Sequence, residues 1–254
     1  MTKELSLKDI DVNFDFTTDT PHYWDNYWEY DKVLGHFNTD PDAYSKAMQL
    51  YHKLLYSRKL PNGETLELQL GSGAKYLTWN NYRFGSDSII ASFRYIKYRH
   101  MIEQVANSMP NWQEYIESYI RKSYTIGGEI IFPKCQGGIN QSRGCNPYIC
   151  DRWDLTLECI RKYYLSEESP LFDVLSKNKD FFELFVDFKG YIDFFFLQDC
   201  VSKDYKSVVF WLGSGEFEKN PFPKTVAEYL EWIEKELKFV ELRNKRIERY
   251  CQLH

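Results

Sequence analysis

The chain has 254 residues, of which 43% are hydrophobic and 18% aromatic, and it carries a formal net charge of −5 at pH 7. This apolar content supplies a stable core and excludes a disordered chain, and the length predicts a single domain over residues 1–254. The acidic balance excludes a protein whose main task is to coat nucleic acid, since that binding depends on neutralising phosphates.

The N-terminus and the apolar stretches indicate neither export nor membrane insertion. Acidic residues interrupt the apolar ones over residues 1–16, which fits neither a signal peptide nor a transit peptide. The longest apolar stretch, 181–201, carries several charged residues and is unsuited to a membrane span. The six cysteines form no C-x-x-C pair, so reduced thiols are expected. We therefore expect a cytoplasmic protein with no membrane partner.

The first third of the chain is predicted to hold an arm, a helix and strands. Residues 1–40 are rich in Asp, Asn, Tyr and Trp, and we expect an irregular aromatic arm lying over the core. A helix is predicted from Asp40 to Arg58, because Asp40 can cap it and apolar residues recur at helical spacing. Alternating apolar residues predict strands over 66–70 and 76–84.

The middle of the chain is predicted to be mainly helical. Ser86 and Ser88 are expected to cap a helix over 89–105, and a second helix follows over 112–121. A compact apolar run within 124–133 predicts a strand that is buried on both faces. A loop is then predicted over 136–147, a helix over 153–164, and a short helix that begins at Ser169-Pro170. A central helix follows over 179–201, with a close helix crossing at Gly190. The last element of this part is a strand over 206–213.

The C-terminal segment predicts a long helix over 225–251. Thr225 and Glu228 form a capping box, and apolar residues then recur at steps of four and three. Asn244 falls in this apolar seam, so a coiled-coil dimer is one interpretation, although the broad apolar face favours packing on the chain's own core. Together the elements predict an α+β fold, with a helix-rich C-terminal half packed against a small sheet.

A Gly-rich loop that leads into a helix forms the first candidate site. The residues concerned are Asn140, Arg143, Asp151, Arg152, Asp154 and Glu158. The two arginines could hold a phosphate, while the three carboxylates Asp151, Asp154 and Glu158 could bind Mg²⁺ or act as general acid and base. The alternative is a helix N-terminus that favours acidic residues and is stabilised by local ion pairs.

Two other patterns have weaker chemical content. Arg94 and His100 lie six residues apart in a predicted helix, a spacing like that of the Arg and His pairs in helical ribonucleases. Chance is the favoured explanation, because Arg249 and His254 show nearly the same spacing. A group of four cysteines could bind zinc, but its intervals do not match a structural zinc site, and buried thiols are expected: Cys135, Cys145, Cys150 and Cys159.

Several segments resemble a bacterial family that is known only as a domain of unknown function. The strings that carry the resemblance run along most of the chain and include FDFTTDTP, YTIGGEIIFP, INQSRG and DRWDLTLECIRKYY. The resemblance implies a free-standing bacterial cytosolic protein of about this length. It implies no activity and no catalytic residue.

Three functions follow as hypotheses. The leading one is an intracellular bacterial enzyme that acts on a phosphate-bearing substrate, RNA or a nucleotide, through the region from Arg143 to Glu158, with help from Arg94 and His100. A phage-defence or toxin-like ribonuclease would be one form of it. The second hypothesis is an interaction protein that forms a homodimer through its C-terminal helix. The third is a sensor domain whose aromatic residues line a small-molecule pocket.

Overall fold

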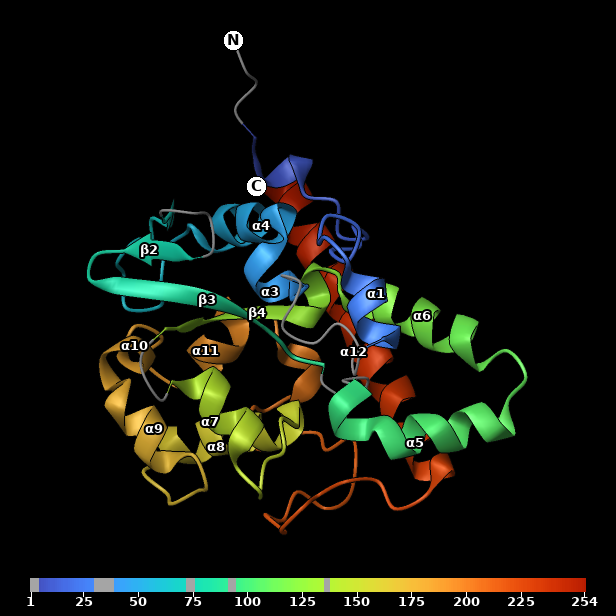
Figure 1. Cartoon of the computed structure of the whole chain (residues 1–254). Coiled ribbons are helices and arrows are strands. Elements are labelled where there is room, and N and C mark those ends of the chain that lie inside the picture. Colours follow the sequence, from blue (N-terminus) through green and yellow to red (C-terminus); the bar gives the residue numbers. More distant parts are fainter. Residues whose placement is uncertain (1–4, 30–38, 72–75, 91–94, 135–137) are drawn as a thin grey trace.

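The computed structural model describes residues 5–29, 39–71, 76–90, 95–134 and 138–254. It has the α+β fold that the sequence predicts. A four-stranded antiparallel sheet, in the order β1-β2-β3-β4, crosses the middle of the molecule and is surrounded by helices (Figure 1).

The sheet is built around its two longer strands. Its strands are β1 (Gln69–Leu70), β2 (Leu77–Trp79), β3 (Tyr82–Ser88) and β4 (Glu129–Pro133). The chain turns between β2 and β3 at Asn80, whose φ of 50° lies in the left-handed region that asparagine tolerates. Strand β3 pairs with β4 from Phe84–Pro133 to Ser88–Glu129, and every residue of β4 is buried. The predicted strand pair at 76–84 and the buried strand within 124–133 are confirmed.

The part of the chain that precedes the sheet in sequence forms the helices η1 (Leu7–Asp9), α1 (Tyr23–Trp28), α3 (Pro41–Tyr44) and α4 (Lys46–Tyr56). Asp40 caps α3 by accepting the N–H of Asp42 at 3.1 Å, as the sequence predicts. Ser45 then caps α4 by accepting the N–H of Met48 at 3.0 Å. The predicted helix from Asp40 to Arg58 is therefore two helices that meet at Ser45.

The predicted helix start at Ile89 is wrong. Strand β3 continues through Ser88, and the next helices are α5 (Tyr95–Ser108) and α6 (Trp112–Ser123). Ser86 and Ser88 do not cap a helix, because their backbones pair with β4 and contacts between distant segments outweigh a local capping tendency. The second predicted helix, over 112–121, is confirmed as α6.

The region after β4 contains one more helix than the sequence predicts. Its helices are α7 (Ile139–Cys145), α8 (Trp153–Tyr164) and α9 (Phe172–Lys177). The loop predicted over 136–147 is wrong, since α7 buries Ile139 and Arg143, which lie one helical turn apart. The helix over 153–164 is confirmed, and α9 begins two residues after Pro170.

The long central helix predicted over 179–201 is also wrong. The segment is divided into α10 (Lys179–Glu183), α11 (Phe188–Phe194) and η4 (Gln198–Cys200). Val186 has a φ of 71°, and the Asp187 carboxylate then caps α11 by accepting the N–H of Gly190 at 2.7 Å. A Cβ at Gly190 would lie 2.1 Å from the Phe185 carbonyl oxygen, so this glycine permits a tight turn rather than a helix crossing.

The strand predicted over 206–213 is reduced to one bridge between Val201 and Val208. The chain then enters α12 (Val226–Leu253), whose cap is close to the predicted one. Thr225 Oγ1 accepts the Glu228 N–H at 3.2 Å, while the Glu228 carboxylate accepts the N–H of Lys224 rather than that of Thr225.

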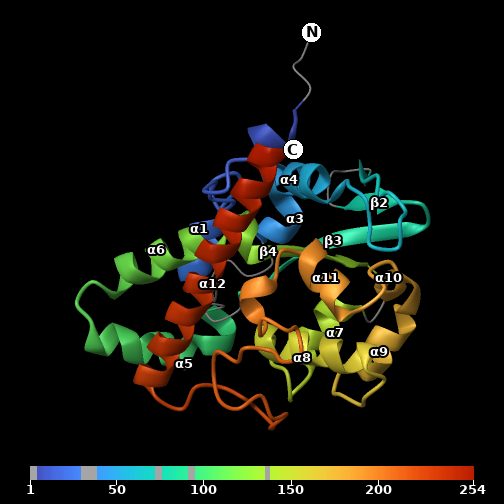
Figure 2. The same ribbon diagram turned by 180° about the vertical axis from the view of Figure 1, so that it is seen from behind.

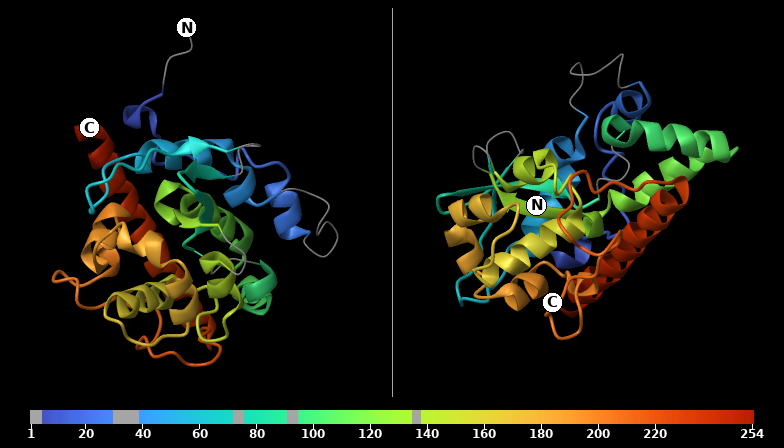
Figure 3. Two further views of the ribbon diagram at one scale, coloured as in Figure 1. Left: turned by 90° about the vertical axis from the view of Figure 1, so that its left-hand side faces the viewer. Right: turned by 90° about the horizontal axis from the view of Figure 1, so that it is seen from below.

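Helix α12 packs on the chain's own core. It lies between the pair α5–α6 and the group of short helices α8–α11 (Figure 2), and it contacts η3 (Ile126–Gly128), α6 and α5. Figure 3 shows from below that α5 and α6 lie on the same side of the molecule as α12, with α8 and α9 on the other. Among the described residues, no helix is long and apolar enough to span a membrane.

Candidate functional site

Arg143, predicted to hold a phosphate, is fully enclosed by the chain. Nη1 donates to the Asp87 carboxylate and, at 2.9 Å, to the Ser88 carbonyl, and Nη2 donates to the Asp151 carbonyl at 3.0 Å. Nε donates to Thr156 Oγ1 at 3.3 Å and lies 3.5 Å from the Asp151 carboxylate. The guanidinium thus joins β3 to the segment before α8.

The other charged residues of the predicted site are likewise paired within the chain. Arg152 donates from Nε and Nη2 to the two carboxylate oxygens of Asp154, at 3.0 and 2.6 Å. Asp154 also accepts the Trp211 N–H at 2.9 Å, and both Arg152 and Asp154 are buried. Glu158 accepts two hydrogen bonds from Arg161, each of 2.8 Å. These pairs match the local ion-pair interpretation of the sequence.

The structure does not gather the predicted Mg²⁺ ligands. Across the described ranges, no three His, Cys, Asp or Glu side chains are placed to hold one metal ion. Each of the three carboxylates is paired with a different arginine: Asp151 with Arg143, Asp154 with Arg152, and Glu158 with Arg161.

The remaining candidates lie elsewhere. Arg94 is outside the described residues, and His100 is exposed on α5. Asn140 does reach the sheet, because its Nδ2 donates to the Ser86 carbonyl at 3.4 Å. Among the predicted site residues that the structure describes, Asn140 and Arg143 therefore contact the end of β3.

A second polar group, not predicted from the sequence, occupies the other face of that strand end. We call it the Glu129 cluster, and it consists of Asp42 on α3, Gln49 and His52 on α4, Ser86 and Ser88 on β3, and Glu129 on β4. Its members come together because Ser88 pairs with Glu129 in the sheet, and because Asp42 accepts the Ser88 N–H at 3.3 Å. All six residues are buried.

The surroundings of Glu129 favour its protonated form. Burial raises the pKa of Glu129 well above its usual value, and the nearby carboxyls of Asp42, Asp87 and Asp40 raise it further. Neither Glu129 oxygen has a hydrogen-bond partner among the described residues, and of its neighbours the Asp42 carboxyl raises its pKa most. A buried carboxyl that no donor stabilises favours its neutral form, so Glu129 favours the protonated state beside Asp42.

The start of β4 is held in place by α12. Arg243 Nη1 donates to the carbonyls of Gly127 and Glu129 at 2.8 and 2.7 Å, and Asn244 Oδ1 accepts the Gly127 N–H at 2.7 Å. A Cβ at Gly127 would lie 2.5 Å from that oxygen, and one at Gly128 would lie 1.8 Å from a carbonyl oxygen of α6. Both glycines are therefore required for the close approach that positions Glu129.

His52 lies on α4, next to Ser86 of β3, and is neutral. Its Nδ1 is 2.9 Å from Ser86 Oγ, and Gln49 Nε2 donates to the same oxygen at 3.0 Å. Burial, and then the positive charge of Arg243, lower the pKa of His52 to about 3. The cluster thus places a neutral imidazole on one face of the sheet with two carboxyls, of which Glu129 favours its protonated form.

One sequence signal could have located this cluster. Glu129 begins a run that is otherwise entirely apolar, and a carboxyl in a fully buried strand is rarely retained without a specific interaction. His52 and Arg243 give no such signal, since each also fits an ordinary amphipathic helix.

Comparison with known families agrees with the resemblance seen in the sequence. The model of a family of unknown function, DUF6994, matches residues 10–247. The chain belongs to this family. The matched segment contains every member of the Glu129 cluster as well as Arg143 and Arg243. No curated protein and no solved structure matches the chain.

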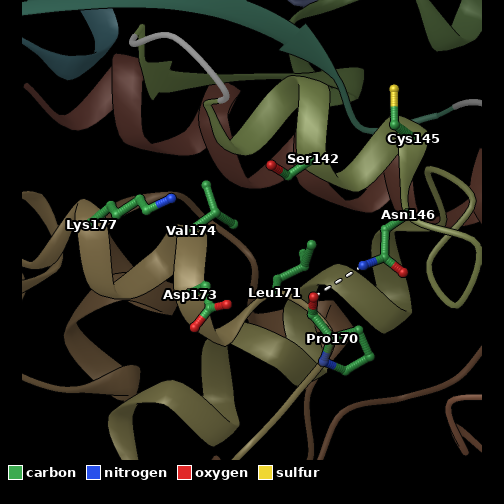
Figure 4. Close-up of a pocket in the computed structure, with 8 residues that line it drawn as sticks. All are labelled: Ser142, Cys145, Asn146, Pro170, Leu171, Asp173, Val174 and Lys177. Atoms are coloured by element: carbon green, nitrogen blue, oxygen red, sulfur yellow. Dashed lines mark hydrogen bonds between the residues drawn. The ribbon is translucent and has the colours of Figure 1, made fainter.

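A separate surface pocket of about 320 Å³ lies between α7 and α9 (Figure 4). Asn146 Nδ2 donates to the Pro170 carbonyl at 3.0 Å at one end, and Lys177 and Asp173 lie at the other. The Cys145 thiol at its rim is exposed. The Glu129 cluster, unlike this pocket, is built from buried polar side chains, and the raised pKa of Glu129 is of the kind that clusters at functional sites.

Glu129→Gln is expected to stabilise the protein increasingly as the pH rises. Below the usual value of 4.5, Glu129 is protonated in both the folded and the unfolded chain. Above it, only the unfolded chain ionises, so the wild type loses about 1.4 kcal/mol of stability per pH unit until the raised pKa of folded Glu129 is reached. Urea unfolding of the wild type and of Glu129→Gln at pH 4.5 and 8 measures this difference in the free energy of unfolding.

Glu67→Gln, at an exposed glutamate, is the matched control and should track the wild type at both pH values. An unchanged difference between Glu129→Gln and wild type across this range would contradict the protonated state of Glu129.

Proposed function

We propose that this protein is an enzyme that acts on a phosphate-bearing substrate, RNA or a nucleotide, and that the Asp42–Glu129 pair moves the protons of the reaction. The observation that carries the proposal is the pair of buried carboxyls, in which burial and the neighbouring Asp42 favour the protonated form of Glu129. Glu129 is fully buried, whereas Asp42 retains 9% of its accessible surface, so Asp42 is the member nearer to solvent.

The charge around the pair supports an anionic substrate. Arg243 is fully buried, and within the described chain it forms no ion pair with a carboxylate. Its hydrogen bonds go to neutral oxygens: the carbonyls of Phe195, Gly127 and Glu129, and the Tyr56 hydroxyl. A buried positive charge without a counter-ion favours an anion nearby, because the low local polarity screens it weakly.

The pair supplies an acid and a base in one place. In a phosphoryl-transfer or hydrolysis step, the unprotonated carboxylate takes the proton of the attacking hydroxyl or water. The protonated carboxyl gives its proton to the leaving oxygen, so no net proton is consumed. General acid–base groups of this kind contribute on the order of 10²–10⁴-fold to a rate.

A turnover assay with purified protein, nucleotides and short RNAs tests the proposal. Asp42→Asn and Glu129→Gln are both expected to lower the rate by about 100-fold or more, because each removes a proton-transfer group while keeping the side-chain shape. Asp180→Asn and Glu67→Gln, at exposed carboxylates, are matched controls and should stay within about twofold of the wild type. Full activity in both Asp42→Asn and Glu129→Gln would refute the proposal.

The setting we propose is the bacterial cytosol, and the free thiols Cys159, Cys200 and Cys251, all buried, support a reducing compartment. The phage-defence form of the hypothesis rests on Arg94 and His100 and stays a prediction from the sequence. A homodimer through α12 also stays a prediction, and Asn244 gives it no support, because its side chain bonds Gly127 and Thr125 of its own chain.

A further inference from the structure

The hydrogen bonds around His52 favour one assignment of the ring proton. Gln49 Nε2 donates to the Asp42 carbonyl at 3.1 Å, which sets the orientation of the amide, and it also donates to Ser86 Oγ at 3.0 Å. The Ser86 oxygen is therefore an acceptor from Gln49, and its hydrogen has no other acceptor among the described residues, so the arrangement that satisfies it is donation to His52 Nδ1 at 2.9 Å. A neutral imidazole that accepts at Nδ1 must carry its hydrogen on Nε2.

The Nε2–H group of His52 has no acceptor among the described residues, although the side chain is fully buried. A buried donor without an acceptor costs roughly 1–3 kcal/mol, and native proteins rarely retain one without a use. Gln49 Oε1, next to it in the cluster, is also without a donor. Two such groups on adjacent turns of α4 indicate a place where a polar ligand completes the hydrogen bonding.

The local charge selects the kind of ligand. The Arg243 guanidinium acts on His52 from the α12 side and has no carboxylate partner in the described chain. The ring cannot become cationic at physiological pH, so it interacts with a ligand as a neutral hydrogen-bond donor. A neutral donor beside a buried positive charge fits an oxygen that is negative or becomes negative during a reaction.

We propose that His52 is a further catalytic residue whose Nε2–H donates a hydrogen bond to a phosphate oxygen of the substrate. This inference rests on the proposed function, because it assigns the same substrate to the same cluster, and it names the group that the substrate presents. The Ser86 hydroxyl and the Gln49 amide are positioning residues that hold the ring in the required tautomer.

Nitrogen-15 NMR of histidine-labelled protein, with inorganic phosphate as the probe, tests the assignment. The His52 signals are identified by their loss in His52→Gln, and His254→Gln, at an exposed histidine, is the matched control. We expect a protonated Nε2 and an unprotonated Nδ1 from pH 8 down to pH 5, and a shift of the Nε2–H signals on adding phosphate. A protonated Nδ1, or His52 signals that phosphate leaves unmoved, would overturn the inference.

Two substitutions separate binding from structure. Asparagine at position 52 can still accept from Ser86 but has no group at the place of Nε2, whereas glutamine can place an N–H there. His52→Asn is therefore expected to weaken phosphate binding about tenfold with the fold retained, and His52→Gln is expected to restore part of it. Equal phosphate affinity in wild type and a folded His52→Asn would also overturn the inference.

The variant Glu129→Gln distinguishes a failure of the His52 inference from a failure of the proposed function. That variant keeps His52 and Arg243, so the phosphate-induced shift of Nε2–H is expected to persist while turnover is lost. Normal turnover in Glu129→Gln with the shift retained would refute the carboxyl-pair proposal and leave the His52 site standing. Loss of turnover in Glu129→Gln, with no phosphate-induced shift of Nε2–H in the wild type, would refute the His52 inference and leave the carboxyl-pair proposal standing.

Discussion

Arg243→Met is expected to lower the free energy of unfolding by at least about 3 kcal/mol, because four buried oxygens lose their donor and each unsatisfied group costs roughly 1–3 kcal/mol. Two of these oxygens belong to Gly127 and Glu129, at the entry to β4, and the other two belong to Phe195 and Tyr56. One side chain of α12 therefore links the entry to β4 with α4 and with the end of α11.

Urea unfolding measures this loss, and Arg249→Met, at an exposed arginine of the same helix, is the matched control. The control should remain within about 0.5 kcal/mol of the wild type, the usual range for a surface substitution. If Arg243→Met folds, its His52 pKa should rise from about 3, because the positive charge that depresses it has been removed. Equal stability of Arg243→Met and Arg249→Met would show that these hydrogen bonds do not hold the core.

Arg143→Met is expected to destabilise the protein by about 3–5 kcal/mol, the cost of leaving buried carboxylates without their counter-ion. Asp87 and Asp151 both face this guanidinium, and their side chains are no more than 9% exposed. The thermal midpoint should therefore fall steeply.

The double variant Arg143→Met with Asp87→Asn separates charge from packing. Removing the stranded Asp87 charge should recover part of the lost stability, so the two substitutions should be less than additive in urea unfolding. Unchanged stability in Arg143→Met alone would instead favour the phosphate-binding role that the sequence predicts. An activity loss in this variant can be assigned to chemistry only if the fold is retained.

The accuracy of the sequence predictions depended on the range of the interactions that form each element. Helices α8 and α12 were predicted correctly because their apolar periodicity and, at α12, the Thr225 cap are local. The segment 179–201 was misread, because its apolar residues suggested one helix while Val186 and Asp187 impose a turn. Strand β3 was cut short in the prediction because its pairing with Glu129 lies some forty residues away in the sequence.

The candidate site shows the same difference between what local sequence patterns predict and what long-range contacts decide. The sequence by itself determined an acidic α+β chain with a capped terminal helix, a buried strand, and a charged region around Arg143. Only the tertiary structure decided that each charged residue from Arg143 to Glu158 is paired within the chain, Arg143 with Asp87 of β3 among them, and that Glu129, Asp42 and His52 share one face of the sheet. The reason is physical: a pKa shift and an unpaired donor arise from burial and from neighbours across the fold, and neither is encoded in the spacing of residues along the chain.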